Sequence, residues 1–314
     1  MKILLTGATG FVGTGLLLRL QAEKAVQIRA AVRAPKGVLP SGVGSVVVGD
    51  LGPETDWREA VTGIDVVIHL AARVHVMRDA ADDPLAEFRR TNVAGTLNLA
   101  RQAAAAGVRR LVFLSSVKVN GEAGTFVEAD TPAPQDPYAI SKHEAEVGLR
   151  GIAAETSLEV VIIRPPLVYG PGVKANFRSL MRAVARGLPL PLGAVANRRS
   201  LVSRDNLADF IAVCAAHPAA ANETFLVSDG EDLSTANLIR RLARAMGRGP
   251  RLIPVPAGVL RFGARLLGKG DVAQRLLGSL QVDITKARRV LGWTPPISVD
   301  EGLRRAAADF SQKG

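Results

Sequence analysis

The stretch that decides the fold is TGATGFVG, residues 6–13, which follows a short apolar run at residues 3–5. The apolar run is typical of a buried strand, and the residues after Gly13 are typical of a helix. Glycines spaced G-x-x-G-x-x-G between a strand and a helix let the backbone turn tightly and approach a pyrophosphate. The helix start adds unpaired N–H groups and a partial positive charge. An ordinary glycine-rich turn is the alternative, so the rest of the chain must decide.

Composition limits the class of protein. The 314 residues suit one large domain or two closely packed ones. A single cysteine, Cys214, excludes a disulfide framework and most cysteine-based metal sites, and it fits a reducing compartment. Met1 and Lys2 lead directly into the first strand, so we expect no secretory signal and a cytoplasmic location. No apolar run is long enough for a membrane span, and the best candidate, residues 256–267, contains two arginines and predicts an amphipathic helix. We therefore expect no membrane insertion.

The formal net charge of +11 is compatible with nucleic acid, an acidic surface or anionic small molecules as partners. The arginines are scattered through helical segments, and few aromatic residues accompany them for base stacking. We expect no nucleic-acid partner. Most of the excess charge is interpreted as solvated surface, with a few residues facing a phosphate-bearing ligand.

Strand and helix patterns alternate through the first half of the chain. After the first strand and helix, strands are expected at residues 26–32, 46–48, 65–69, 110–114 and 160–163. Helices are expected at residues 57–61, at 85–106 and from Pro137 onward. This order predicts an α/β fold with a doubly wound parallel (Rossmann) sheet. Residues 1–166 with roughly 199–217 are predicted to form this domain. Residues 167–198 and 218–314 are predicted to form a smaller mixed lobe that binds substrate.

Three side chains combine into a catalytic pattern. Tyr138 and Lys142 are four residues apart on a predicted helix, so they share one face. An ammonium beside a phenol is expected to lower the phenol pKa from its usual value of about 10. Ser116 comes just after the end of a strand, where its hydroxyl can bond the oxygen of a reacting alcohol or ketone. Each residue has an ordinary structural explanation alone, but together they predict an acid–base catalytic set.

The chain resembles the extended short-chain dehydrogenases/reductases over essentially its full length. The matching pieces, in order, are TGATGFVG, GDL at 49–51, HLAA at 69–72, TNVAGT at 91–96, SS at 115–116, Y-x-x-x-K at 138–142 and RPP at 164–166. The resemblance implies an oxidoreductase that uses a nicotinamide dinucleotide. It also suggests a homodimer through the long helices at 85–106 and 137–154. His75 has no Cys or His neighbour at ligand spacing, so no metal is expected.

The same resemblance implies specific site residues. Ser116, Tyr138 and Lys142 would be catalytic, with Lys142 also holding the nicotinamide ribose and Asp50 bonding the adenine amino group. The full set of implied cofactor contacts is Gly7, Gly10, Phe11, Val12, Gly13, Arg33, Asp50, Leu51, Leu70, Ala71, Ala72, Asn92, Ser115, Tyr138, Lys142, Pro165 and Leu167.

Within this family, several pieces are similar to the nucleotide-sugar branch that includes UDP-galactose 4-epimerase: YGPG at 169–172, LPLG at 190–193 and LGWTP at 291–295. The segments at 73–77 and 118–122 resemble a subgroup that reduces UDP-4-keto-6-deoxy-N-acetylglucosamine. The implied substrate contacts are Arg73, His75, Ser116, Lys118, Asn120, Asn176, Leu192, Arg199 and Asp283. Arg199 and Lys118 as solvated side chains, and Asn176 as a plain helix-start residue, remain alternatives.

The end of the second strand bears on cofactor choice. It reads Ala31-Val32-Arg33, with no carboxylate for the adenosine ribose, and Arg33 can instead meet a 2′-phosphate. This favours NADP(H), whereas an Arg33 that stacks on adenine or faces solvent leaves NAD(H) possible.

From the resemblance, we expect reduction of the C4 ketone of a UDP-linked N-acetyl deoxyhexose for surface-polysaccharide synthesis. The alternatives are a 4-epimerase with tightly bound NAD⁺ and a non-catalytic dinucleotide sensor.

Overall fold

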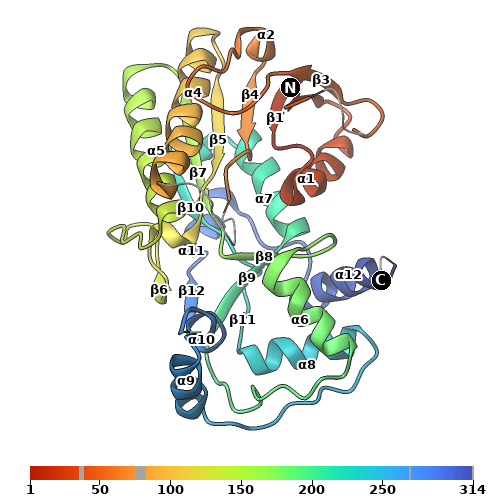
Figure 1. Cartoon of the computed structure of the whole chain (residues 1–314). Coiled ribbons are helices and arrows are strands. Elements are labelled where there is room, and N and C mark those ends of the chain that lie inside the picture. Colours follow the sequence, from red (N-terminus) through yellow and green to blue (C-terminus); the bar gives the residue numbers. More distant parts are fainter. Residues whose placement is uncertain (35–38, 75–82, 269, 313–314) are drawn as a thin grey trace.

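The computed structural model describes residues 1–34, 39–74, 83–268 and 270–312. Its main feature is a seven-stranded sheet in the order β10-β7-β5-β4-β1-β2-β3, and every neighbouring pair in it is parallel (Figure 1). The strands are β1 (Lys2–Thr6), β2 (Gln27–Val32), β3 (Gly44–Val47), β4 (Val66–His69), β5 (Arg110–Leu114), β7 (Glu159–Arg164) and β10 (Thr224–Leu226). The predicted doubly wound fold is confirmed.

Helices cover both faces of this sheet because successive strand residues point to opposite sides. On β1, Ile3 and Leu5 pack into one core with α1 (Phe11–Gln21) and α7 (Arg204–Ala216). Leu4 packs into the other core with α2 (Arg58–Val61), α4 (Gly95–Ala105) and α5 (Pro137–Glu155). The alternating apolar side chains of β1 and β4 therefore pack into cores on both faces, which is typical of a parallel sheet.

The helix expected at residues 85–106 is interrupted. It consists of α3 (Pro84–Phe88), a π-helical turn η1 (Arg89–Ala94) and α4. A π turn inserts one extra residue into the helix, which shifts the side chains that follow; such turns are frequent at functional sites. Here it carries Asn92.

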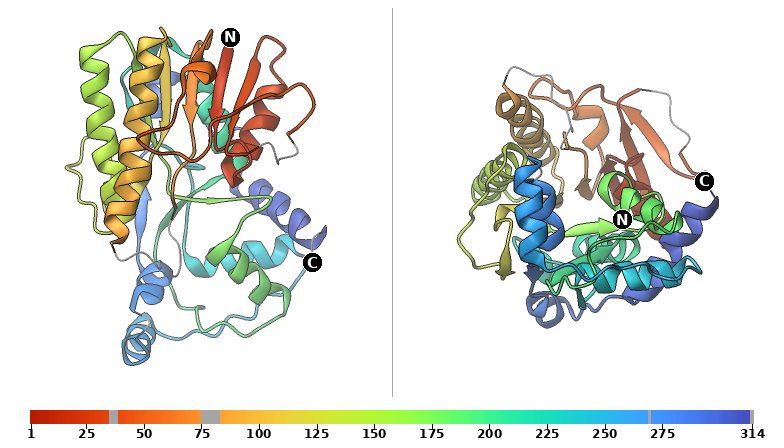
Figure 2. Two further views of the ribbon diagram at one scale, coloured as in Figure 1. Left: turned by 45° about the horizontal axis from the view of Figure 1, so that its top comes forward. Right: turned by 60° about the horizontal axis from the view of Figure 1, so that its bottom comes forward.

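A smaller lobe is built on a second sheet that runs β11-β9-β12-β6, with β8 paired to β9. Its strands are β6 (Gly124–Phe126), β8 (Leu167–Tyr169), β9 (Arg199–Ser203), β11 (Asp232–Leu233) and β12 (Leu280–Val282). Its helices are α6 (Ala175–Ala185), α8 (Thr235–Ala245), α9 (Ala257–Leu266), α10 (Gly270–Leu277) and α12 (Val299–Gln312), while α11 (Thr285–Leu291) packs beside β10. Short 3₁₀ turns η2 (Val117–Val119) and η3 (Pro218–Ala220) complete the chain. The left view of Figure 2 shows this lobe below the carboxyl ends of the large sheet.

The strand pairing of the second half differs from expectation. The segment 199–217 was predicted to return to the large sheet, but β9 lies in the small sheet and only α7 packs back, against α1. The strand that completes the large sheet is β10, from the part predicted to belong to the small lobe. A short apolar strand carries no mark of which sheet it joins, because that depends on partners distant in sequence. The division into two domains at those boundaries stays a prediction.

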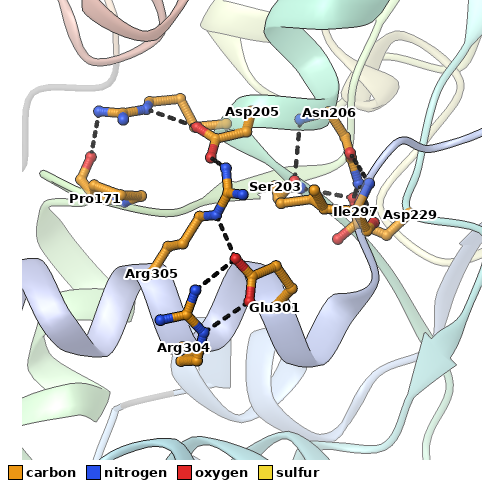
Figure 3. Close-up of polar contacts among 10 residues, drawn as sticks. Pro171, Ser203, Asp205, Asn206, Asp229, Ile297, Glu301, Arg304 and Arg305 are labelled. Atoms are coloured by element: carbon orange, nitrogen blue, oxygen red, sulfur yellow. Dashed lines mark hydrogen bonds and ion pairs between the residues drawn. The ribbon is translucent and has the colours of Figure 1, made fainter.

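Polar contacts join the two lobes where β9 meets α7 (Figure 3). The Asp229 carboxylate accepts hydrogen bonds from the Ser203 backbone N–H at 2.8 Å and from the Asn206 amide at 2.7 Å. On the neighbouring helix α12, Arg305 bridges Asp205 at 2.6 Å and Glu301 at 2.7 Å. These contacts hold α12 and β9 against α7, so the small lobe is fixed over the sheet edge.

Over the described residues, no helix is long and apolar enough to cross a membrane.

A buried ion pair supports the same edge. Arg164, at the end of β7, donates to both oxygens of Glu146 on α5, at 2.9 Å from Nε and 2.5 Å from Nη2. Glu146 is fully buried and Arg164 nearly so. The Ser115 hydroxyl donates to Glu146 at 2.6 Å, and Arg164 also donates to the Asn120 side-chain carbonyl at 3.0 Å. The network thus ties β5, β7 and α5 together.

Because this pair is desolvated, removing one partner leaves an uncompensated buried charge. We expect Glu146→Leu to lower the free energy of unfolding by about 3–5 kcal/mol. The double variant Glu146→Leu/Arg164→Met, which removes both charges, should lose clearly less. Urea denaturation of Glu146→Leu, Arg164→Met and the double variant tests this, and a double variant that loses as much stability as the two single variants together would contradict it.

Candidate active site at the carboxyl edge of the large sheet

The turn between β1 and α1 is packed so closely that only glycine fits. A Cβ on Gly13 would lie 2.1 Å from the Gly7 carbonyl oxygen, and one on Gly7 would lie 2.8 Å from the Ala71 nitrogen. Gly7 also has a φ of 70°, which side chains disfavour. The helix begins directly after Gly10, whose own N–H donates to the Gly7 carbonyl at 2.9 Å. Bare backbone therefore surrounds the start of α1, a cradle that fits the pyrophosphate of a dinucleotide.

A buried chain of polar side chains holds the cradle to β4. The Thr6 hydroxyl oxygen accepts from the Ala71 N–H at 3.1 Å and contacts His69 Nδ1 at 2.7 Å. His69 Nε2 contacts the Thr96 hydroxyl at 3.0 Å on α4. Burial, with the nearby Lys142, lowers the His69 pKa to about 3, so the imidazole is neutral and bridges rather than titrates. The sequence motifs contained all three residues, but their roles depend on this packing.

The predicted catalytic residues gather at the end of β5. Lys142 is buried, with its Nζ donating to the Leu114 carbonyl at 2.8 Å and lying 4.4 Å from the Phe113 ring centroid. The same Nζ is 6.0 Å from the Tyr138 ring centroid. Ser116 lies two residues after the end of β5 and caps η2, its hydroxyl accepting from the Lys118 N–H at 3.3 Å. Phe88 meets the Tyr138 ring edge-on, with centroids 6.1 Å apart.

The expected lowering of the Tyr138 pKa is wrong for the ligand-free chain. Desolvation, followed by the charge of Asp136, raises the Tyr138 pKa to about 12. Desolvation lowers the Lys142 pKa to about 7, against the opposing effect of Glu146. Burial thus outweighs the attraction that the Tyr-x-x-x-Lys spacing suggested, because both groups lose water together. The phenol keeps its proton at neutral pH, the form that can donate to a carbonyl oxygen.

The two residues predicted at the adenosine end contact each other. Arg33 Nε lies 2.8 Å from the Asp50 carboxylate, and both side chains are about 80% exposed (81% and 80%). An ion pair in open solvent contributes little stability, so either partner can exchange it for a ligand. Asp50 and Leu51 also line a cavity of about 240 Å³.

Other predicted cofactor contacts have protein partners. Asn92 bonds the Arg73 backbone through both amide atoms, at 2.8 and 3.0 Å, which fixes the loop after β4. The Ser115 hydroxyl is engaged with Glu146, so its side chain supports the edge rather than facing it. The Pro165 carbonyl accepts from the Val117 N–H at 3.0 Å, and Leu167 is exposed. Phe11, Val12, Leu70 and Ala72 are partly exposed around the cradle.

Two basic side chains predicted to contact substrate lie near Tyr138. Lys118 pairs with Asp136, directly before the helix that carries Tyr138, and with Glu122 at 3.2 Å. The Arg73 guanidinium lies 5.6 Å from the centroid of Phe88, the ring that touches Tyr138. These contacts place both cations beside the catalytic set.

The remaining predicted substrate residues are dispersed. Asn120 is buried and holds Arg164 and the Val127 carbonyl, so its side chain is committed to the fold. Leu192 lies in the core of the small lobe, and its N–H donates to Leu190. Asp283 accepts from the Thr285 N–H at 2.6 Å beside the start of α11. Their assignment as substrate contacts stays a prediction.

Two further predictions concern the small lobe. Arg199 donates to the carbonyls of Arg275 at 3.0 Å and Gly278 at 3.2 Å, and desolvation lowers its pKa. Asn176 is exposed at the start of α6, after Ala175, whose φ of 50° is unusual for a residue with a side chain. His75 lies outside the described residues.

With this geometry established, comparison with known proteins places the chain. The sequence profile of the NAD dependent epimerase/dehydratase family matches residues 3–228. The chain belongs to that family. It is therefore an enzyme of this family rather than a non-catalytic sensor, and it carries the extended short-chain dehydrogenase/reductase fold.

Individual proteins are similar to this chain over nearly its whole length. A Vibrio cholerae protein named UDP-glucose 4-epimerase is 49% identical, covering 99% of this chain and 96% of that one. The solved structure of MoeE5 in complex with UDP-glucose and NAD is 27% identical, with a TM-score of 0.79 over 100% of this chain and 99% of that chain. The UDP-glucuronic acid 4-epimerase of Bacillus cereus, 22% identical, shares the fold with a TM-score of 0.81, covering 99% and 97% of the two chains.

The glycine cradle makes a direct prediction. Gly13→Ala forces the start of α1 away from the Gly7 carbonyl, so dinucleotide affinity should fall at least tenfold and stability by about 1–3 kcal/mol. Gly151→Ala in α5 is the control, since a Cβ there meets nothing within 4 Å and should stabilise by about 0.5–1 kcal/mol. Calorimetric titration and denaturation measure both. Unchanged dinucleotide affinity in Gly13→Ala would rule out the cradle.

The buried lysine predicts a pH dependence of stability. The Lys142 pKa is about 7 in the folded chain against 10.5 ordinarily, so between these values the unfolded chain binds more protons. Stability attributable to this group should therefore rise with pH across that window, by at most about 1.4 kcal/mol per pH unit. Denaturation of the cofactor-free protein and of Lys142→Gln from pH 6.5 to 9.5 tests this. A stability difference between the two that stays flat with pH would contradict the assignment.

Proposed function

We propose that this enzyme transfers hydride at C4 of a UDP-linked hexose, with Tyr138 as the acid–base group. The observation that carries the proposal is the hydrogen bond from Lys142 to the Leu114 carbonyl, two residues before Ser116, with the Tyr138 ring centroid 6.0 Å from the same Nζ. The 49% identity with a protein named UDP-glucose 4-epimerase supports the substrate class. The MoeE5 complex with UDP-glucose and NAD supports the same class of ligand.

Each side chain has a distinct role in this proposal. The start of α1 and the Ala71 backbone would hold the dinucleotide, which when bound supplies the hydride donor or acceptor. Tyr138 exchanges a proton with the C4 oxygen, and the Ser116 hydroxyl donates a hydrogen bond to that oxygen. The Lys142 ammonium, 6.0 Å from the phenol ring centroid, stabilises the phenolate when it forms.

The substrate's diphosphate is proposed to bind at Arg199. Its guanidinium is largely desolvated, and the partners it has are two backbone carbonyls, which leave its positive charge uncompensated. A diphosphate would compensate this charge, and the planar guanidinium presents paired donors to its oxygens. Asn176, Arg73 and Lys118 would contact the nucleotide and sugar around it.

Two modes of C4 chemistry are candidates. Epimerisation, in which C4 is oxidised and then reduced on the other face with retained NAD⁺, is the first, because the 49% identical relative carries that name. Reduction of a 4-keto sugar by NADPH is the second. It is favoured by Arg33, because the second strand ends without a carboxylate that could bond the adenosine ribose. A homodimer through the outer faces of α4 and α5, where Val147 is exposed, is also proposed.

One set of assays on the purified protein separates the modes. An epimerase should release NAD(H) on denaturation and interconvert UDP-glucose with UDP-galactose, or the N-acetylated pair, without added cofactor. A reductase should consume NADPH in a 1:1 ratio with a UDP-4-keto-6-deoxy sugar.

Tyr138→Phe is the control for both assays. It should keep dinucleotide binding and the melting temperature while lowering kcat by at least about 100-fold. Full activity in this variant, or turnover that does not depend on the UDP moiety, would reject the proposed mechanism.

A further inference from the structure

Most of the excess positive charge of the chain comes from one segment. Residues 234–270 contain seven arginines and one lysine and no acidic residue, against a net charge of +11 for the whole chain. The segment runs from the start of α8 through a linker to α9 and the start of α10. Figure 1 shows it at the end of the small lobe that lies farthest from the large sheet. This end is distinct from the edge where the catalytic residues gather.

Helix α9 exposes apolar side chains along one line. Val259, Phe262 and Leu266 are 60%, 67% and 72% exposed, and their i, i+3, i+7 spacing puts them on one stripe. Leu260 faces the other way and packs on the small-lobe core. Leu267 and Val272 extend the exposed apolar surface toward α10. A stripe this apolar is unusual on a free surface and indicates a binding partner.

Arginines accompany the stripe. Arg261 and Arg265 are exposed and fall on the flank of the same helix, next to Phe262 in projection. Farther along this end of the lobe, Arg186, Arg248 and Arg251 line a cavity of about 330 Å³ whose other lining residues are Ala185, Gly187 and Gly249. Ile253, exposed, lies between that cavity and α9 in the chain. Figure 1 shows α8 and α9 at the two ends of the linker.

We propose that this end of the molecule docks peripherally on an anionic lipid surface. The α9 stripe enters the boundary between headgroups and acyl chains, while the arginines meet lipid phosphates, as in interfacial amphipathic helices. A second copy of the chain is disfavoured as the occupant, because residues 234–270 contain no acidic residue and pairing this segment with itself would bring its arginines together. An acidic lipid surface complements both the charge and the apolar stripe.

Docking at this end leaves the large sheet and the catalytic edge away from the membrane. The proposal does not depend on the substrate or on the mode of catalysis, so it can fail while the proposed function stands.

The test is cosedimentation of the whole protein with vesicles. Vesicles of phosphatidylcholine with 40% phosphatidylglycerol should bind the protein at low salt and release it at 0.5 M salt, and pure phosphatidylcholine should bind it weakly. Phe262→Ser/Leu266→Ser should weaken binding at least tenfold. Arg261→Gln/Arg265→Gln should weaken it by roughly 25-fold, at about fivefold for each arginine.

The matched control is Leu18→Ser/Val47→Ser, which removes two apolar side chains of similar exposure, 62% and 52%, from the large-sheet domain. It should bind vesicles like the unaltered protein, and all variants should melt at the same temperature. Equal binding to both vesicle types, or equal loss in the control, overturns the proposal. So does a change in sedimentation-velocity mass in Phe262→Ser/Leu266→Ser without a change in vesicle binding, which would assign the stripe to a second copy.

Discussion

The site depends on how closely the backbone approaches itself after β1. Gly13 packs on the Gly7 carbonyl, and Gly7 packs on the Ala71 nitrogen, at distances that no Cβ tolerates. This contact sets the direction of α1, so that its N-terminus lies at the carboxyl edge of the sheet. The Thr6–His69–Thr96 chain then holds the loop after β4 in the same place. A cofactor cradle and the strand ends that carry chemistry are thus positioned by one set of backbone contacts.

Burial of charge determines the chemistry at this edge. Glu146 compensates Arg164 and accepts from Ser115, which leaves Lys142 with a backbone carbonyl and an aromatic ring as its near neighbours. Desolvation in these surroundings lowers the pKa of the Lys142 ammonium and raises the pKa of the Tyr138 phenol. In the ligand-free chain, desolvation is therefore the main cause of both pKa shifts.

Local patterns predicted most of the fold. The strand–helix alternation, the glycine turn and the Tyr138–Lys142 pair all depend on residues within a few positions of each other, where period and spacing carry the information. Ser116 was found by its place just after a predicted strand. The π turn at Asn92 and the pairing of β9 could not be predicted this way, because the partners that decide them are distant in sequence. Asn120 bonds Arg164, 44 residues away, and Arg199 bonds the Arg275 carbonyl, 76 residues away. The predicted lowering of the Tyr138 pKa was wrong for the same reason, because the burial that raises this pKa depends on the whole fold.

The distribution of arginine partners separates the two ends of the molecule. On α12, Arg304 and Arg305 both bond Glu301 at 2.7 Å. On α8, Arg241 pairs with Glu231, which lies outside the segment 234–270. Arg261 and Arg265 lie within a stretch that has no acidic residue from 234 to 270, so their helix offers them no such pairing. Averaged over the chain, the excess charge suggests an ordinary solvated surface. Placed on the structure, it accompanies the exposed stripe of α9, and a helix with an apolar line and uncompensated cations is suited to a boundary between water and anionic lipid.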